Sequence, residues 1–322
     1  MKLKFLLLIA TFMLLGTVAN AQSSSSISVS MVPPNPAPYE NTSITLSSYV
    51  YNLDSVLISW SVNGKTIASG TGKKSLFTIA PAAGKETNVV ATISLPDGTI
   101  ETKVTMRPSV MVLLWQANDS HVPPFYKGKA LPTPDSEVKV VAMPEIRTSS
   151  GLANSKNMTY AWKKDYTNNV DGSGYGKNFF LYINDYLDDS NNISVTALTL
   201  DQKYSNQANI NIGITQPKIL FYKKDNNIGT IWSKMLTDLY KIQGPEIVEA
   251  VPYFISPKEL QHPALVWNWS INDNIVNTQD LKKNLMPLQA QSGVSGTSKL
   301  RLEIENRDKI FQTTSKEISI EF

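Results

Sequence analysis

The 322-residue chain contains no cysteine and only two histidines, His121 and His262. Without cysteine no disulfide can form, so the chain must be stabilised by hydrophobic cores or by a metal ion. Histidine is the usual general base near neutral pH, and neither histidine lies near a nucleophile pattern of serine or cysteine. Zinc-binding spacings such as HExxH are also missing, so the sequence predicts a protein that is not an enzyme.

The chain also lacks a large excess of charge of one sign. It has 30 Lys and Arg and 27 Asp and Glu, which gives a net charge of +3. Such a balanced chain offers no basic region to nucleic acid, so we expect no nucleic-acid partner. Long apolar runs are confined to the N-terminus, where "MKLK" precedes "FLLLIATFMLLGTVA" and then "ANA". This order predicts a signal peptide over residues 1–21, followed by a Ser-rich spacer over 22–26.

The predicted signal peptide implies a protein that is secreted or held at the cell surface or envelope, with no transmembrane span after cleavage. An uncleaved N-terminal anchor is the alternative interpretation of the same apolar run. A short signal and a cysteine-free mature chain favour a bacterial exported protein.

Three similar tryptophan-containing segments are present in the sequence: "ISWSVNG", "TYAWKKDY" and "VWNWSIND", around Trp60, Trp162 and Trp269. An alternating apolar and polar run lies 33 residues after each tryptophan, and the three alignments need no gap. The aligned positions at 17 and 33 residues are Phe77, Phe179 and Met286, then Ile93, Val195 and Leu302. Equal spacing in three places indicates three copies of one unit.

The alternation inside each unit has a period of two, as in "KLRLEIE" at residues 299–305, which is typical of half-buried antiparallel strands. Short strands between Asn, Asp, Gly and Pro turns indicate β-sandwiches. With a Trp on an early strand, the unit resembles the immunoglobulin-like family, including PKD-type modules and cysteine-free bacterial surface proteins. The resemblance implies an all-β chain of three tandem immunoglobulin-like sandwiches, over residues 27–107, 108–216 and 217–322.

One segment of the third unit departs from this pattern. In "NIGTIWSKMLTDLYKI", Ile231, Met235 and Leu239 recur at the spacing of a helix. The sequence therefore predicts a short helix over residues 229–241, inserted between the first two strands of the third domain.

Two features are candidates for ligand binding. The segment "INDYLDDSNN" offers oxygen ligands for calcium from Asp185, Asp188, Asp189 and Asn191, although its spacing is not that of an EF-hand and acidic turns are common for solvation alone. No other cofactor is expected. Tyr126, in the loop "HVPPFYKGK", and Trp232 are the aromatic residues that we expect at a partner-binding surface.

These observations predict an exported surface or envelope protein that acts as a binding or structural spacer through protein–protein contacts. By analogy, the expected partner is another envelope or surface protein, such as a pilus or secretion component. The alternative is a glycan-binding adhesin or accessory carbohydrate-binding protein. A hydrolase built on a sandwich would need converging carboxylates or a metal cluster in a cleft, and the sequence shows neither strongly.

Overall fold

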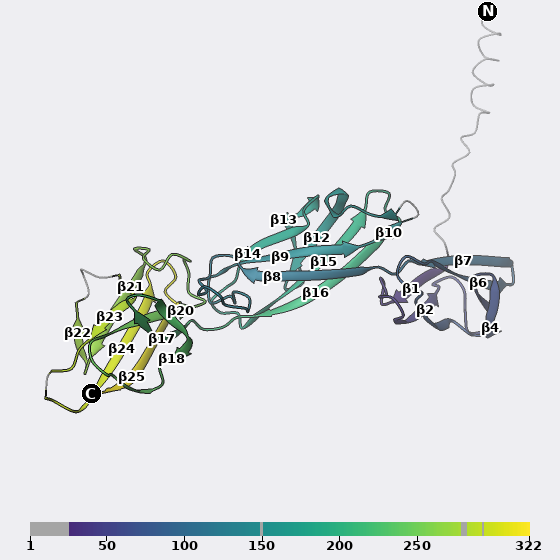
Figure 1. Ribbon diagram of the computed structural model, residues 1–322. Coiled ribbons are helices and arrows are strands. Elements are labelled where there is room, and N and C mark those ends of the chain that lie inside the picture. Colours follow the sequence, from purple (N-terminus) through teal and green to yellow (C-terminus); the bar gives the residue numbers. More distant parts are fainter. Residues whose placement is uncertain (1–25, 149–150, 278–281, 292) are drawn as a thin grey trace, which may run out of the picture. The chain divides into compact units, whose positions relative to one another are not determined.

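The computed structural model describes residues 26–148, 151–277, 282–291 and 293–322, and the chain divides into two compact units that meet at Pro108 and Ser109 (Figure 1). The predicted signal peptide and nearly all of the predicted spacer lie outside the described residues. Within those ranges the structure is all-β, and its one helical segment is a 3-10 turn at Ser155–Asn157. None of the described helices is long and apolar enough to cross a membrane.

The first unit is a sandwich of two antiparallel sheets, with strand orders β1-β2-β5 and β4-β3-β6-β7. Apolar and polar residues alternate along most of its strands, so one face of each sheet enters the core and the other faces solvent. The strands are β1 (Ser28–Val32), β2 (Asn41–Ser47), β3 (Leu57–Val62), β4 (Lys65–Thr71), β5 (Ser75–Ile79), β6 (Thr87–Leu95) and β7 (Gly98–Met106).

The second sandwich repeats this strand order, with sheets β14-β9-β8 and β13-β12-β15-β16 and a small β10-β11 hairpin. The first, second and fifth main strands again share one sheet, which is the immunoglobulin-like arrangement expected from the sequence. Its strands are β8 (Val110–Ala117), β9 (Glu137–Glu145), β10 (Arg147–Thr148), β11 (Gly151–Leu152), β12 (Met158–Lys164), β13 (Thr167–Tyr175), β14 (Phe179–Ile183), β15 (Ser190–Thr199) and β16 (Ser205–Gly213).

The third sandwich keeps the order and adds two strands, giving sheets β18-β17-β20-β23 and β19-β25-β24-β21-β22. Strand β19 pairs in parallel with β25, while the other pairs are antiparallel. The strands are β17 (Lys218–Asp225), β18 (Gly229–Met235), β19 (Leu239–Lys241), β20 (Glu246–Tyr253), β21 (Leu265–Ile271), β22 (Asn274–Val276), β23 (Leu285–Leu288), β24 (Thr297–Asn306) and β25 (Thr313–Glu321).

The helix predicted over residues 229–241 is wrong, because this segment forms β18 and β19. Its position between the first two strands of the sandwich is as expected, but its backbone pairs with β17 and β25. Leu236 is the buried apolar residue of the segment, and its amide donates to the Phe221 carbonyl at 2.8 Å. Pairing with two existing sheets thus overrides the helical spacing of the side chains.

The three repeated tryptophans are core residues of the three sandwiches, and each is 1% exposed. Each indole Nε1 donates to a lysine carbonyl just before the fifth main strand, at 2.8 to 2.9 Å. The pairs are Trp60 with Lys73, Trp162 with Lys177 and Trp269 with Lys283. Tryptophan therefore satisfies its own donor while it fills the core, and the same contact recurs in each copy.

The ungapped alignment of the copies is wrong by two residues in the first sandwich. Trp162 pairs across the sheet with Val195 and Trp269 with Leu302, but Trp60 pairs with Ala91. The positions 17 residues after the tryptophans are not equivalent either, since Phe77 and Phe179 are exposed while Met286 is buried.

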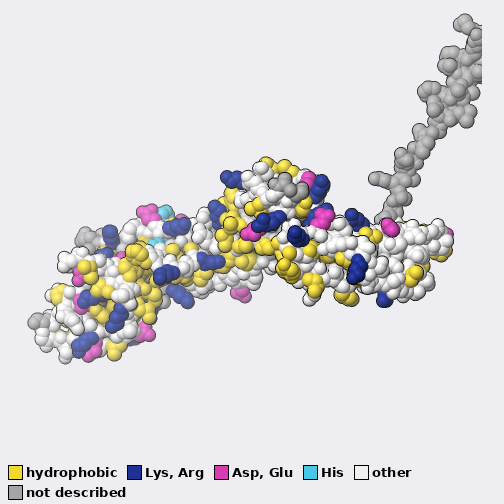
Figure 2. All heavy atoms as spheres, turned by 45° about the vertical axis from the view of Figure 1, so that its right-hand side comes forward, with side chains coloured by type: hydrophobic (Ala, Val, Ile, Leu, Met, Phe, Trp, Pro, Cys, Tyr) yellow, Lys and Arg dark blue, Asp and Glu magenta, His cyan; other side chains and the backbone are white. Residues whose placement is uncertain are grey.

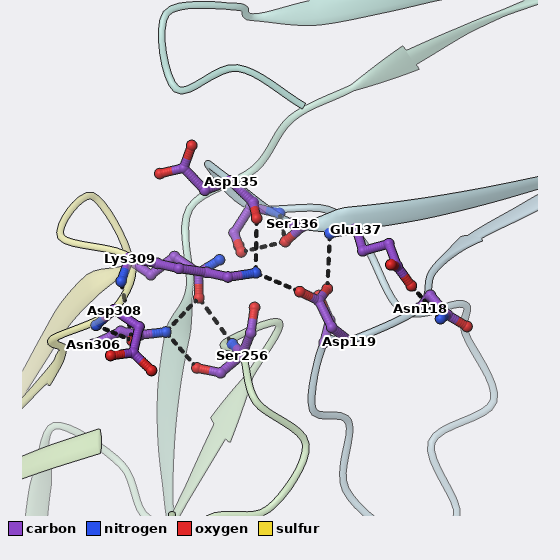
Figure 3. Close-up of polar contacts among 12 residues, drawn as sticks. Asn118, Asp119, Asp135, Ser136, Glu137, Ser256, Asn306, Asp308 and Lys309 are labelled. Carbon is purple, nitrogen blue, oxygen red and sulfur yellow. Dashed lines mark hydrogen bonds and ion pairs between the residues drawn. The ribbon is translucent and has the colours of Figure 1, made fainter. Parts of the chain in front are cut away.

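A polar junction joins the second and third sandwiches (Figure 3). Lys309 donates to the Asp119 carboxylate at 2.5 Å and to the Asp135 carbonyl at 2.7 Å. The buried Gln312 amide donates to the Pro134 carbonyl, also at 2.7 Å. Because these bonds cross between two sandwiches and are partly or fully buried, they fix the loop that leads into β9 against the third sandwich.

Candidate functional site

The sheet made of the first, second and fifth main strands presents a different outer face in each sandwich. In the first sandwich this face is mostly hydroxylic, with Ser28 bonded to Ser47 at 2.8 Å and Thr45 to Ser75 at 3.1 Å. Hydroxyl groups are well solvated at a surface, whereas one end of this face exposes three apolar side chains, Val32, Phe77 and Ile79.

In the second sandwich the corresponding outer face, on β14-β9-β8, is apolar and open to solvent. Seven large apolar side chains on it are between 38% and 66% exposed. They are Val110, Val112 and Leu114 on β8, Met143 on β9, and Phe179, Leu181 and Ile183 on β14. Figure 2 shows hydrophobic side chains at the surface of this part of the chain. We call these seven residues the open face.

Charged residues border the open face along its central strand. Glu137 and Lys139 lie at one end of β9, and Glu145 lies at the other. Arg147 follows in β10 and is exposed, while Ile146 before it is buried, so the alternation continues past the end of β9. The Lys139 ammonium is 4.9 Å from the centre of the Phe179 ring, over which its positive charge is stabilised.

In the third sandwich the corresponding outer face is partly apolar and covered, and it also carries the ion pair of Lys224 with Glu249. Val251 and Tyr222 point away from the core of this sandwich, yet they are only 3% and 7% exposed. Tyr126 packs edge to face on Tyr253, with ring centres 5.7 Å apart, and Trp232 packs on Tyr222 at 5.3 Å. The loop between β8 and β9 and the added strand β18 therefore supply the cover.

Tyr126 and Trp232, predicted from the sequence as partner-binding residues, are thus brought to the same sheet face. The hydroxyls of Tyr222 and Tyr253 lie 3.3 Å apart beneath them, and burial together with this hydrogen bond raises the pKa of Tyr253. The rings of Tyr126 and Tyr253 meet at 80°, and those of Tyr222 and Trp232 at 53°. Such tilted rings pack well with each other but do not make a flat stacking platform.

Of the predicted calcium ligands, Asp185, Asp188 and Asp189 lie between β14 and β15 and Asn191 lies in β15, and a lysine balances part of their negative charge. Asp188 accepts from the Asn191 amide at 2.7 Å and lies 3.4 Å from the Lys164 ammonium. Asp185 accepts from the Leu187 amide at 2.9 Å, and the Asp189 carbonyl accepts from a backbone amide. Over the described ranges, no group of three or more His, Asp or Glu is placed to hold a metal ion.

Asp165, on the turn between β12 and β13, completes this cluster and was not predicted from the sequence. Burial alone would raise the pKa of Asp165, but bonds from the Asn192 amide, Lys164 and Asn191 outweigh it and hold that pKa below its usual value. The carboxylates of Asp165 and Asp188 both contact the Lys164 ammonium. Calcium binding stays a prediction, at a site where a lysine already balances negative charge.

The open face was also missed in the sequence, although a signal was present. The strands β8, β9 and β14 contain the nearly continuous apolar runs "VMVLLW", "VVAM" and "FFLYI". Alternation is typical of a strand with one solvated face, whereas a continuous run is typical of a strand covered on both faces. These runs therefore indicate a sheet whose outer face, as well as its core face, is apolar enough to be buried against another surface.

No protein-family model matches the chain, and no curated protein matches it. Solved structures of tandem modules are similar to it at a low level. Fibronectin(III)-like modules of Clostridium thermocellum CbhA are 18% identical, with 59% of this chain and 95% of that chain covered and a TM-score of 0.28.

Two further structures cover more of the chain. Three N-terminal domains of the bacteriophage RB49 outer capsid protein Hoc are 8% identical, with 92% of this chain and 97% of theirs covered and a TM-score of 0.26. A Bacteroides ovatus glucan-utilisation protein, SGBP-B, in complex with a heptasaccharide is 11% identical, with coverages of 91% and 70% and a TM-score of 0.24. At these scores the assignment of the fold rests on the strand order described above.

Proposed function

We propose that the chain is an exported, non-catalytic binding protein that acts through protein–protein contacts made by the open face of its second sandwich. The observation that carries this proposal is the contrast between two equivalent sheet faces. One is covered by Tyr126 and Trp232, and the other leaves seven large apolar side chains in solvent. Monomeric soluble proteins rarely leave a contiguous apolar surface of this kind without a partner.

The chemistry of the open face favours a protein over a glycan. Its side chains are aliphatic apart from Phe179, and Lys139 lies over that ring. A glycan-binding surface needs exposed aromatic faces together with polar groups that bond to hydroxyls, whereas an aliphatic sheet with charges at its ends resembles the centre and rim of a protein interface. The aromatic rings of Tyr126 and Trp232, in turn, pack on the sheet of the third sandwich.

A photo-crosslinking amino acid placed on the open face tests this function. We would replace Leu181, which is 43% exposed on β14, in the full chain expressed in its own cells. The matched control is the same replacement at Ile275, an apolar residue that is 86% exposed on β22 of the third sandwich. Irradiation followed by denaturing electrophoresis then shows which position contacts another polypeptide.

A crosslink to a protein from position 181, and none from position 275, is the expected result. Equal crosslinking from the two positions would mean that the open face is no more a binding surface than any other exposed apolar residue. Absence of a crosslink from both would likewise contradict the proposed function.

A further inference from the structure

We infer that the occupant of the open face is a second copy of this chain, packed face to face with its β9 strand antiparallel to β9 of the first copy. This inference rests on the proposed function, because it names the partner of the same surface. It is carried by the order of charges along the central strand and by the apolar rows between them.

The charges along β9 and its extension are opposite at equal distances from Ala142. Lys139 and Glu145 lie three residues to either side of it, and Glu137 and Arg147 lie five residues to either side. All four share the parity of Met143, whereas Ala142 itself is fully buried in the core. Glu137, Lys139 and Glu145 therefore line the outer side of the sheet, with the apolar Met143 between the charges, and Arg147 follows in β10, which pairs with β11 outside this sheet.

A two-fold axis brings opposite charges of two chains together if it lies between the two sheets and runs perpendicular to the strands at the level of Ala142. Such an axis reverses the strand direction and keeps each strand opposite its own copy. Lys139 of one chain then faces Glu145 of the other. This pair occurs twice, so two ion pairs border the apolar centre, and a parallel arrangement would instead place like charges together.

The same axis brings the two central apolar rows of the sheet against each other, while Val110 faces Gln116 of the second copy and Leu181 and Ile183 extend past the start of its β14. Within the sheet, Val112 pairs with Met143, and Leu114 pairs with Val141, which pairs with Phe179 on its other side. Because the axis passes between these two rows, Val112 faces Leu114 of the second copy and Met143 faces Val141. Two sheets packed with aligned strands in this way form the interior of an ordinary β-sandwich.

The area of the open face determines how tightly the two copies are expected to bind. Three strands of up to nine residues span about 30 Å by 14 Å. That footprint of about 420 Å² per partner is about half that of a standard stable interface, so we expect a weak, reversible dimer whose population depends on protein concentration.

Charge reversal measured by sedimentation equilibrium tests the inference. Lys139→Glu and Glu145→Lys each place like charges opposite one another twice, so each should raise the dimer dissociation constant at least about tenfold. The double variant restores opposite charges with their signs exchanged and should return the constant close to that of the unchanged chain. Lys299→Glu, on β24 of the third sandwich, is the matched control and should leave dimerisation unchanged.

The outcomes separate this inference from the proposed function. A double variant as weak as the single variants would exclude the antiparallel arrangement, and an unchanged chain that stays monomeric throughout the accessible concentrations would exclude the dimer. If the chain is monomeric but position 181 crosslinks to a different protein, the inference fails and the proposed function holds. If neither association occurs, both fail.

Discussion

The second and third sandwiches carry the same sheet with the same strand order, but they treat its outer face in different ways. In the third sandwich a loop of its neighbour and the added strand β18 bring Tyr126 and Trp232 over the face. In the second sandwich the equivalent face leaves Leu114, Leu181 and Ile183 in solvent. The apolar part of the sheet face in the third sandwich is therefore covered by other parts of the same chain. We propose that the face in the second sandwich is covered by another chain.

The aromatic residues that stand out in the sequence have a role in the fold of the third sandwich. Tyr126 and Trp232 are aromatic residues that lie outside the repeated pattern. Their rings are used to complete the third sandwich, with Tyr126 packed against Tyr253 and Phe254. The open face consists of ordinary apolar residues, and their common surface depends on which strands lie side by side.

The largest expected effect distinguishes the two sides of one strand. Phe180 on β14 is 2% exposed and stacks on Trp162 with ring centres 5.6 Å apart, while its neighbour Phe179 lies on the open face. Phe180→Ala should lower the free energy of unfolding of the second sandwich by about 3–5 kcal/mol. Phe179→Ala should lower it by less than about 1 kcal/mol in the monomer, because little apolar area is lost from a core. Hydrogen exchange of the β9 amides in the full chain measures both, and equal losses would contradict the assignment of the faces.

A charge introduced on the covered face should lower stability, whereas a charge introduced on the open face should prevent self-association. Val251→Asp buries a carboxylate without a partner, so the third sandwich should lose about 3 kcal/mol of unfolding free energy. Leu181→Asp places the charge in solvent, so the fold should change by no more than about 0.5 kcal/mol while self-association is lost. Thermal unfolding and sedimentation of the two variants check this. A stable Val251→Asp protein would show that the third face is not covered.

Removal of one covering ring should have a smaller effect. Tyr126→Ala deletes edge-to-face contacts with Tyr253 and Phe254, which we expect to cost about 1–2 kcal/mol. Phe125, the preceding residue, is 86% exposed, so Phe125→Ala is the matched control and should have no measurable effect. Hydrogen exchange of the β20 amides reports the stability of the covered sheet. Similar results for the two variants would mean that Tyr126 is not part of the cover.

The smallest expected effect concerns acid pH and the loop that holds Tyr126. Burial lowers the pKa of His121, whose Nδ1 lies 2.8 Å from the Lys258 carbonyl of the third sandwich. The unfolded chain therefore takes up a proton at higher pH than the folded chain, so this stability is present above about pH 6.5 and is lost as the pH falls below it. Melting temperatures between pH 7.5 and 5.5 should fall more for the unchanged protein than for His121→Gln. Parallel curves would contradict this role.

Much of the fold follows from local patterns in the sequence. Trp60, Trp162 and Trp269 mark equivalent core strands because the alternation around them has a period of two and each indole reaches a nearby carbonyl. The turns after these strands are also local, since Asn63 and Gly64 both adopt positive φ, as the tight turn of a hairpin requires. Such features need only a few neighbouring residues.

The rest depends on contacts between distant segments. The spacing of Ile231, Met235 and Leu239 favours a helix locally, and only pairing of β19 with β25, about eighty residues later, decides otherwise. The open face is likewise a property of three strands taken together. Each apolar run has an ordinary explanation on its own, and the shared uncovered surface appears only when β8, β9 and β14 are placed side by side.

The most direct test of self-association through the open face compares the oxidation of two methionines in the full chain. Met143 on the open face and Met235 on β18 are both 50% exposed, so dilute protein should react with hydrogen peroxide at similar rates at the two positions. As the protein concentration rises through the dimerisation range, peptide mass spectrometry should show slower oxidation of Met143 and an unchanged rate at Met235. Equal oxidation of Met143 and Met235 at every concentration would show that no second copy covers the open face.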